Sequence, residues 1–124
     1  MTKRSPRPTI RKSKAKVARR YLKFIEVQKN PKVIKSLIQN SPDSVIKGIC
    51  NCALNTCNGS VHLTKKQKQL FGRHRALIAH LTDKKKSIKS KREIINQKGG
   101  AGFLIPLLIS TALSALGSGV FGQQ

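Results

Sequence analysis

Charge is distributed along this chain in a way that limits how much of it can pack into a core. The sequence of 124 residues has 26 Lys and Arg but only four Asp and Glu, giving a formal net charge of +22. All of these residues precede residue 99, and residues 99–124 carry no charged side chain. Because like charges repel at this density, residues 1–98 are expected to bind a polyanion, either nucleic acid or an anionic membrane surface.

This pattern divides the chain into four segments. Residues 1–20 are basic and almost free of apolar side chains, which predicts a disordered basic arm. Residues 21–98 predict a basic helical region, residues 99–102 a Gly-rich hinge or cleavage site, and residues 103–124 an uncharged hydrophobic tail. Since no period-2 alternation is long enough for a sheet, we expect a mostly α fold. Its parts would be the basic arm, a small unit of two to four short helices, and a hydrophobic C-terminal helix.

Apolar residues return at helical spacing after the arm. Tyr21, Phe24 and Ile25 follow an i, i+3, i+4 pattern, which predicts a buried helix face. Ser41 is expected to cap the next long helix, with Pro42 in its first position. That helix would present an apolar face made of Val45, Ile46, Ile49, Cys50, Ala53, Leu54 and Cys57.

Two further helices are indicated by their end signals. Gly59 is expected to end the preceding helix, and Thr64 with Gln67 forms a capping-box pattern that opens a helix over 64–81. A last basic helix is expected within 83–97. The expected core comprises Leu37, Ile46, Ile49, Leu54, Phe71, Leu77 and Leu81.

Three cysteines and a histidine raise the alternative of a metal site. Cys50, Cys52, Cys57 and His62 have the spacing C-x-C-x4-C-x4-H, and all four are ligand types that zinc accepts. However, C-x-C within a helix directs the two thiols to different faces, and Cys is a common buried residue. We therefore expect no metal and no other cofactor. The odd number of cysteines, and an N-terminus without a secretory apolar core, favour a reducing compartment.

No arrangement of residues indicates an enzyme. His74 and His80 lie six residues apart, and no carboxylate is placed to orient either of them. The four acids are scattered, so neither an acid–base pair nor a carboxylate metal site is indicated. We expect a protein without catalytic residues.

The basic side chains predict non-specific binding to double-stranded DNA or to RNA. Their charge would neutralise about 22 phosphates, or roughly 11 base pairs, which suits coating or condensing better than reading one site. No sequence-specific recognition motif is apparent. The expected phosphate contacts are Lys3, Arg4, Arg7, Arg11, Lys12, Lys14, Lys16, Arg19, Arg20, Lys65, Lys66, Lys68, Arg73, Arg75, Lys84, Lys85, Lys86, Lys89, Lys91 and Arg92.

The C-terminal segment FLIPLLISTALSAL, residues 103–116, has two alternative roles. It could interact with a membrane, which would make the chain a membrane-active or single-span protein with a basic cytoplasmic or nuclear side. It could instead pack against protein, as a buried helix or against a capsid partner. Either role would involve Phe103, Leu104, Leu107, Leu108, Ile109, Leu113 and Leu116. A third alternative, a ribosomal or RNA-packaging protein, explains the charge but not this tail.

Two sequence stretches resemble a known family. LTKKQKQLFGRHR, followed by a Lys/Arg run and KREIINQKGGAGFLIPLL, is similar in layout to adenovirus core protein X (the mu precursor) and its counterparts in Polinton/Maverick elements and adintoviruses. The resemblance covers roughly residues 60–116. It implies a virion core protein that condenses double-stranded viral DNA, located in the virion core and the host nucleus. The cysteine cluster and the helical middle depart from a bare mu-like peptide.

The resemblance also implies processing by a viral cysteine protease of the adenain type. The segment Gln97, Lys98, Gly99, Gly100 and Ala101 fits such a site, with the cut after Gly100. Two glycines also extend readily into a narrow protease groove, because they have no side chains. The alternative is that Gly99 and Gly100 only end a helix near Lys98, and the two roles are compatible.

Overall fold

The computed structural model describes residues 12–59, 61–97 and 101–116, excluding the side chains of 12–14, 101–103 and 115–116. Every regular element in these ranges is helical, so the mostly α prediction is confirmed. The expected two to four short helices are too few, because these ranges contain seven helices in all. They are α1 (Lys12–Glu26), α2 (Pro31–Asn40), α3 (Asp43–Cys57), α4 (Lys65–Arg73), α5 (Arg75–Thr82), α6 (Ile88–Gln97) and α7 (Ala101–Leu116).

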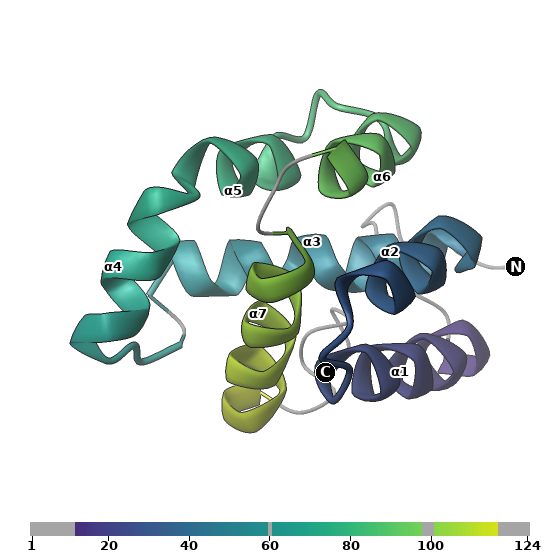
Figure 1. Ribbon diagram of the computed structural model, residues 1–124, viewed down its shortest axis with the longest axis horizontal. Coiled ribbons are helices and arrows are strands. Elements are labelled where there is room, and N and C mark those ends of the chain that lie inside the picture. The colour runs from purple at the N-terminus through teal and green to yellow at the C-terminus, as the bar shows by residue number, and fades with distance from the viewer. Residues whose placement is uncertain (1–11, 60, 98–100, 117–124) are drawn as a thin grey trace, which may run out of the picture.

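Helix α3 runs through the middle of the fold. Helices α5 and α6 lie on one side of it, and α1 and α7 lie on the other (Figure 1). Helix α4 projects at one end, where it contacts α5. The core therefore forms around α3, which packs against α1, α5, α6 and α7.

Helix α1 corrects the predicted basic arm. Residues 12–20 are helical rather than disordered, because Ala15 and Ala18 extend a buried face that continues through Leu22 and Ile25. Phe24 was expected in this face but is 53% exposed. Residues 1–11, the rest of the predicted arm, lie outside the described part of the chain.

The junction between α2 and α3 differs from the prediction by one residue. Asn30 caps α2 by accepting a hydrogen bond from the Lys32 backbone N–H at 2.9 Å. Ser41 ends α2 instead of capping α3, since its hydroxyl donates to the Ile38 carbonyl at 2.8 Å. The N-cap of α3 is Pro42, which makes no side-chain capping bond.

Helix α3 is buried around much of its circumference. Other helices pack against two sides of α3, and five of its side chains are therefore fully buried: Val45, Ile46, Ile49, Cys52 and Ala53. Two residues of the predicted face are exceptions: Leu54 is 40% exposed and Cys57 is exposed. The end at Gly59 is confirmed: the helix stops at Cys57, and Gly59 has a φ of +84°, a conformation that only glycine adopts readily.

The helix predicted over 64–81 is two helices. Its capping box is confirmed, with Gln67 N–H bound to the Thr64 hydroxyl at 3.2 Å and Thr64 N–H bound to Gln67 Oε1 at 2.9 Å. The break falls at His74, whose φ of −109° and ψ of 23° leave the helical region. Its N–H bonds to the Phe71 carbonyl, closing α4 with a tighter turn. Gly72, a poor helix former, lies two residues before the break.

Helix α7 is part of the core. Leu104, Ile105, Leu108, Ile109 and Ala112 are fully buried, and Leu107 and Leu113 pack against the core with partial exposure. Their neighbours are α1, α2, α3 and α6. Since α7 starts at Ala101, residues 101–102 belong to this helix and not to the predicted hinge. None of the helices in the described ranges has the length and apolar run needed to cross a membrane.

Candidate nucleic-acid interface

The surface of the molecule is covered with uncompensated positive charge. Every Lys and Arg between Lys16 and Lys89 is exposed. Within the described residues, the one salt bridge joins Arg92 to Asp43, so these exposed cations have no carboxylate partner in that part of the chain. Such side chains are available to bind phosphate groups.

Helix α1 provides one basic surface. Lys16, Arg19, Arg20 and Lys23 are exposed, while the opposite side of the helix is buried against α3 and α7. The spacing of the small buried alanines determines which side faces solvent, and all four cations lie on it. Lys12 and Lys14 belong to the same helix, with side chains outside the described part.

Helices α4 and α5 provide a second basic surface. Lys65, Lys66, Lys68 and Arg73 are exposed on α4, and Arg75 is exposed at the start of α5. In Figure 1 this part of the molecule lies at the end opposite α1. Two basic surfaces at opposite ends can contact two different nucleic-acid segments.

The loop from α5 to α6 presents three consecutive lysines, Lys84 to Lys86. Asp83 shapes this loop, because its carboxylate accepts the Lys85 N–H at 2.9 Å and its carbonyl accepts the Lys86 N–H at 3.1 Å. Ser87 then opens α6 by accepting the Ser90 N–H at 3.0 Å. An acidic residue thus holds the turn that exposes the lysines.

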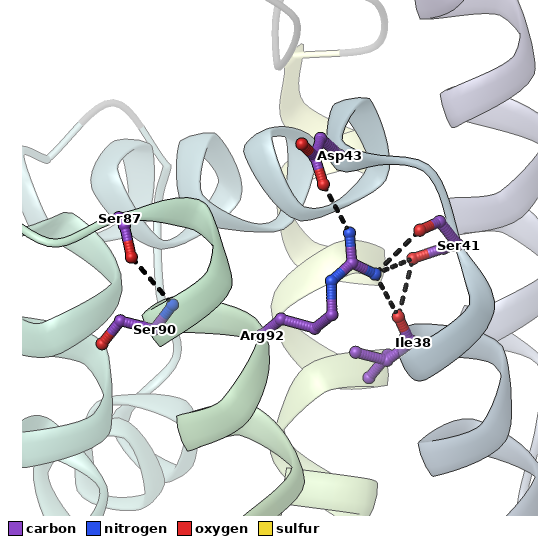
Figure 2. Close-up of polar contacts among 6 residues, drawn as sticks. All are labelled: Ile38, Ser41, Asp43, Ser87, Ser90 and Arg92. Carbon is purple, nitrogen blue, oxygen red and sulfur yellow. Dashed lines mark hydrogen bonds and ion pairs between the residues drawn. The ribbon is translucent and has the colours of Figure 1, made fainter.

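Arg92 is not an exposed phosphate contact, which corrects the prediction. Its guanidinium donates to the Ile38 carbonyl at 2.6 Å and to the Ser41 carbonyl at 2.8 Å, and it pairs with Asp43 at 2.7 Å (Figure 2). The Ile38 and Ser41 carbonyls lie at the C-terminal end of α2, where backbone carbonyls have no partner within the helix, and Asp43 lies in the first turn of α3. Arg92 therefore joins α6 to the α2–α3 junction.

Lys91 also departs from the prediction, because it is only 8% exposed. It lies on the side of α6 that faces α3, next to Cys50. The remaining predicted contacts, Lys3, Arg4, Arg7 and Arg11, lie outside the described residues.

The sequence-based list missed several exposed cations. They are isolated in the sequence and therefore do not stand out as charge runs: Lys29, Lys32, Lys35 and Lys47. The helical spacing of the apolar residues could have identified two of them. Ile34 and Ile38 form the buried face of α2, so Lys32 and Lys35 lie on the face exposed to solvent.

The candidate metal ligands are not brought together. Within the described residues, no three His, Cys, Asp or Glu side chains form a group that could hold a metal ion. Burial raises the pKa of Cys50 to about 11 and that of Cys52 to about 12, so both thiols remain protonated at neutral pH. His80, one of the two histidines considered for catalysis, contacts the Ser90 hydroxyl, with Nε2 and Oγ 3.0 Å apart.

The predicted cleavage segment connects the last two helices. Gln97 is the exposed last residue of α6 and Ala101 the first residue of α7. Lys98, Gly99 and Gly100 lie outside the described part of the chain.

Comparison of this chain with protein-family models, curated proteins and solved structures finds no match.

Proposed function

We propose that this protein binds double-stranded DNA without sequence specificity and condenses it by neutralising phosphate charge, as a structural protein of the virion-core type acting in the virion core and the host nucleus. The observation that supports this proposal best is the exposure of every cation from Lys16 to Lys89, with a single ion pair among the described residues. Charge of this kind binds a polyanion by releasing its counterions.

The arrangement of the charge favours condensation over simple coating. Helices α1 and α4 lie at opposite ends of the molecule, so one protein can contact two duplexes (Figure 1). Most of the cations are lysines, whose flexible ammonium groups act as point charges and do not impose the fixed geometry needed to recognise a base.

The first experiment measures affinity for two unrelated 20-base-pair duplexes by fluorescence anisotropy at several salt concentrations. We expect similar affinities for both sequences and a linear fall of log K with log salt, with about 0.9 units of slope per phosphate contacted. Binding that persists at high salt, or that differs strongly between the duplexes, would contradict the proposal. The same series with an RNA duplex tests whether RNA is the preferred ligand.

A pair of matched variants tests the α4 surface. Replacing Lys65, Lys66 and Lys68 by Gln should reduce the salt slope by about 3, because three phosphate contacts are removed. Replacing the same residues by Arg preserves the charge and should leave the slope unchanged. An unchanged slope in the Gln variant would exclude α4 from the interface.

We also propose that a viral cysteine protease cuts the chain after Gly100. The exposed Gln97 and the helix boundaries on either side support this site. The test is the intact mass of the protein in assembled particles, with a Gly100→Val variant as the control. A full-length mass for the unmodified chain in mature particles would refute the cut.

The membrane alternative requires apolar side chains of α7 that are fully buried in the core, namely Leu104, Leu108 and Ile109, so the structure favours the packing role for this segment.

A further inference from the structure

A groove lies between α3 and the segment that joins α5 to α6. Its volume is about 500 Å³, within the range of small binding sites. Helix α3 contributes Lys47, Cys50, Asn51 and Leu54, which follow an i, i+3, i+4, i+7 pattern on one face. The opposite wall contains Leu81 and Thr82 at the end of α5, then Lys84, Lys86, Ile88 and Lys91.

The groove combines an apolar surface with an entirely positive charge. Leu54, Leu81 and Ile88 supply aliphatic surface, and Leu54 is 40% exposed although it is a large apolar residue. Four lysines line the groove, from α3, the α5–α6 loop and α6, and none of the described residues that line it is Asp or Glu. A ligand that matches both properties must carry several negative charges and an apolar group.

Lys91 adds a positive charge to the groove wall on a side chain whose stem is mostly buried. It is 8% exposed, yet its ammonium makes no hydrogen bond or ion pair with any described residue. Asn96 Oδ1 is the one fully buried polar side-chain atom without a partner among the described residues, so the Lys91 ammonium keeps contact with solvent and is available to an anion bound in the groove. The Lys91 charge also opposes the rise that burial causes in the pKa of Cys50, which places it at the groove wall beside this thiol.

We propose that this groove binds an acidic peptide segment of a protein partner, with aliphatic side chains on Leu54, Leu81 and Ile88 and carboxylates on the four lysines. This interaction goes beyond DNA binding and would let one molecule contact DNA and an acidic protein together. Two features favour a peptide over nucleic acid or lipid. Among the described residues that line the groove there is no aromatic ring on which a base could stack, and the four lysines come from three separate elements on both walls and do not form one flat basic face.

The test uses the full chain and a fluorescein-labelled 14-residue peptide that has Leu at helical i, i+3, i+4, i+7 spacing and Glu at most other positions. Fluorescence anisotropy should show saturable binding, and a peptide with Ser in place of each Leu should bind about tenfold more weakly. Equal binding of the two peptides would overturn the proposal, since attraction by charge alone does not need the groove.

Matched variants separate the groove from the general positive charge. Lys91→Met keeps the buried stem but removes the charge, and Leu54→Ser removes an exposed apolar contact; each should weaken peptide binding about tenfold. Lys66→Met makes the same charge change on α4 and should alter it less than twofold. Equal losses in Lys91→Met and Lys66→Met would refute the proposal.

DNA binding by the same variants distinguishes this inference from the proposed function. Lys91→Met should change DNA affinity less than twofold. The variant with Lys65, Lys66 and Lys68 replaced by Gln should bind DNA more weakly, and its affinity for the peptide should change only by the small amount expected from the lower net charge. If Lys91→Met weakens DNA binding tenfold, the groove binds DNA and the proposal fails. The proposal also fails if vesicles of anionic lipid displace the labelled peptide while the unlabelled peptide does not. Unchanged far-UV circular dichroism confirms that the variants are folded.

Discussion

Truncating Leu108 to Ala tests whether the uncharged C-terminal segment belongs to the folded core. Leu108 is fully buried in α7, which packs against α1, α2, α3 and α6. The substitution therefore loses the whole transfer free energy of the deleted methyl groups and leaves a cavity, a cost of about 3 to 5 kcal/mol. A cost of this size is a large part of the about 5 to 15 kcal/mol that stabilises an ordinary domain.

Urea unfolding followed by circular dichroism measures this effect. With a slope of about 2 kcal/mol per molar urea, the midpoint should fall by about 1.5 to 2.5 M. Leu54→Ala is the matched control: it deletes the same atoms from a side chain that is 40% exposed, so its midpoint should move much less. Measurements in moderate salt reduce the mutual repulsion of the lysines.

The reasoning would be refuted if Leu108→Ala and Leu54→Ala shifted the midpoint by equally small amounts. That result would mean that α7 contributes nothing to the cooperative unit and that the segment is an independent tail, as its composition first indicated.

Three further predictions concern single side chains. Arg92→Lys should destabilise the protein by about 1 to 3 kcal/mol in thermal unfolding, because a lysine cannot serve the two α2 carbonyls and Asp43 together; an unchanged midpoint would contradict this. In the native protein a maleimide should label Cys57 alone, as mass spectrometry would show, and label all three cysteines after denaturation. Burial raises the pKa of Cys50 and Cys52 from 9.0 to about 11 and about 12, so above pH 9 the unfolded state binds fewer protons than the folded state. Their contribution to stability is thus complete below pH 9 and falls as pH rises towards 11, and Cys52→Ala should flatten this fall in urea titrations.

The features predicted correctly from sequence are those determined by neighbouring residues. The capping box of Thr64 and Gln67 and the turn at Gly59 depend on contacts within three or four positions, so a short pattern is enough to identify them. The start of α1 was missed because small alanines between lysines give a weak apolar signal, although their spacing continues that of Leu22.

The errors in the candidate site arise from contacts between distant parts of the chain. Arg92 lies in a run of basic residues and has the composition of a phosphate contact, but its partners Ile38, Ser41 and Asp43 are about fifty positions away. Lys91 belongs to the same run and is buried because α6 packs on α3. Composition indicates how much positive charge exists, whereas tertiary packing decides which cations remain exposed.

The burial of α7 has a consequence for any cut between α6 and α7. Cleavage there would turn an intramolecular contact into an association between two chains, whose occupancy depends on concentration. If the protein is packed at high concentration in a particle, as proposed, the two pieces would stay together, whereas dilution would favour their separation and expose the apolar surface that α7 covers. A synthetic peptide of residues 101–116 would then compete for the vacated surface. Cleavage would therefore make the stability of the fold depend on the concentration of the two pieces.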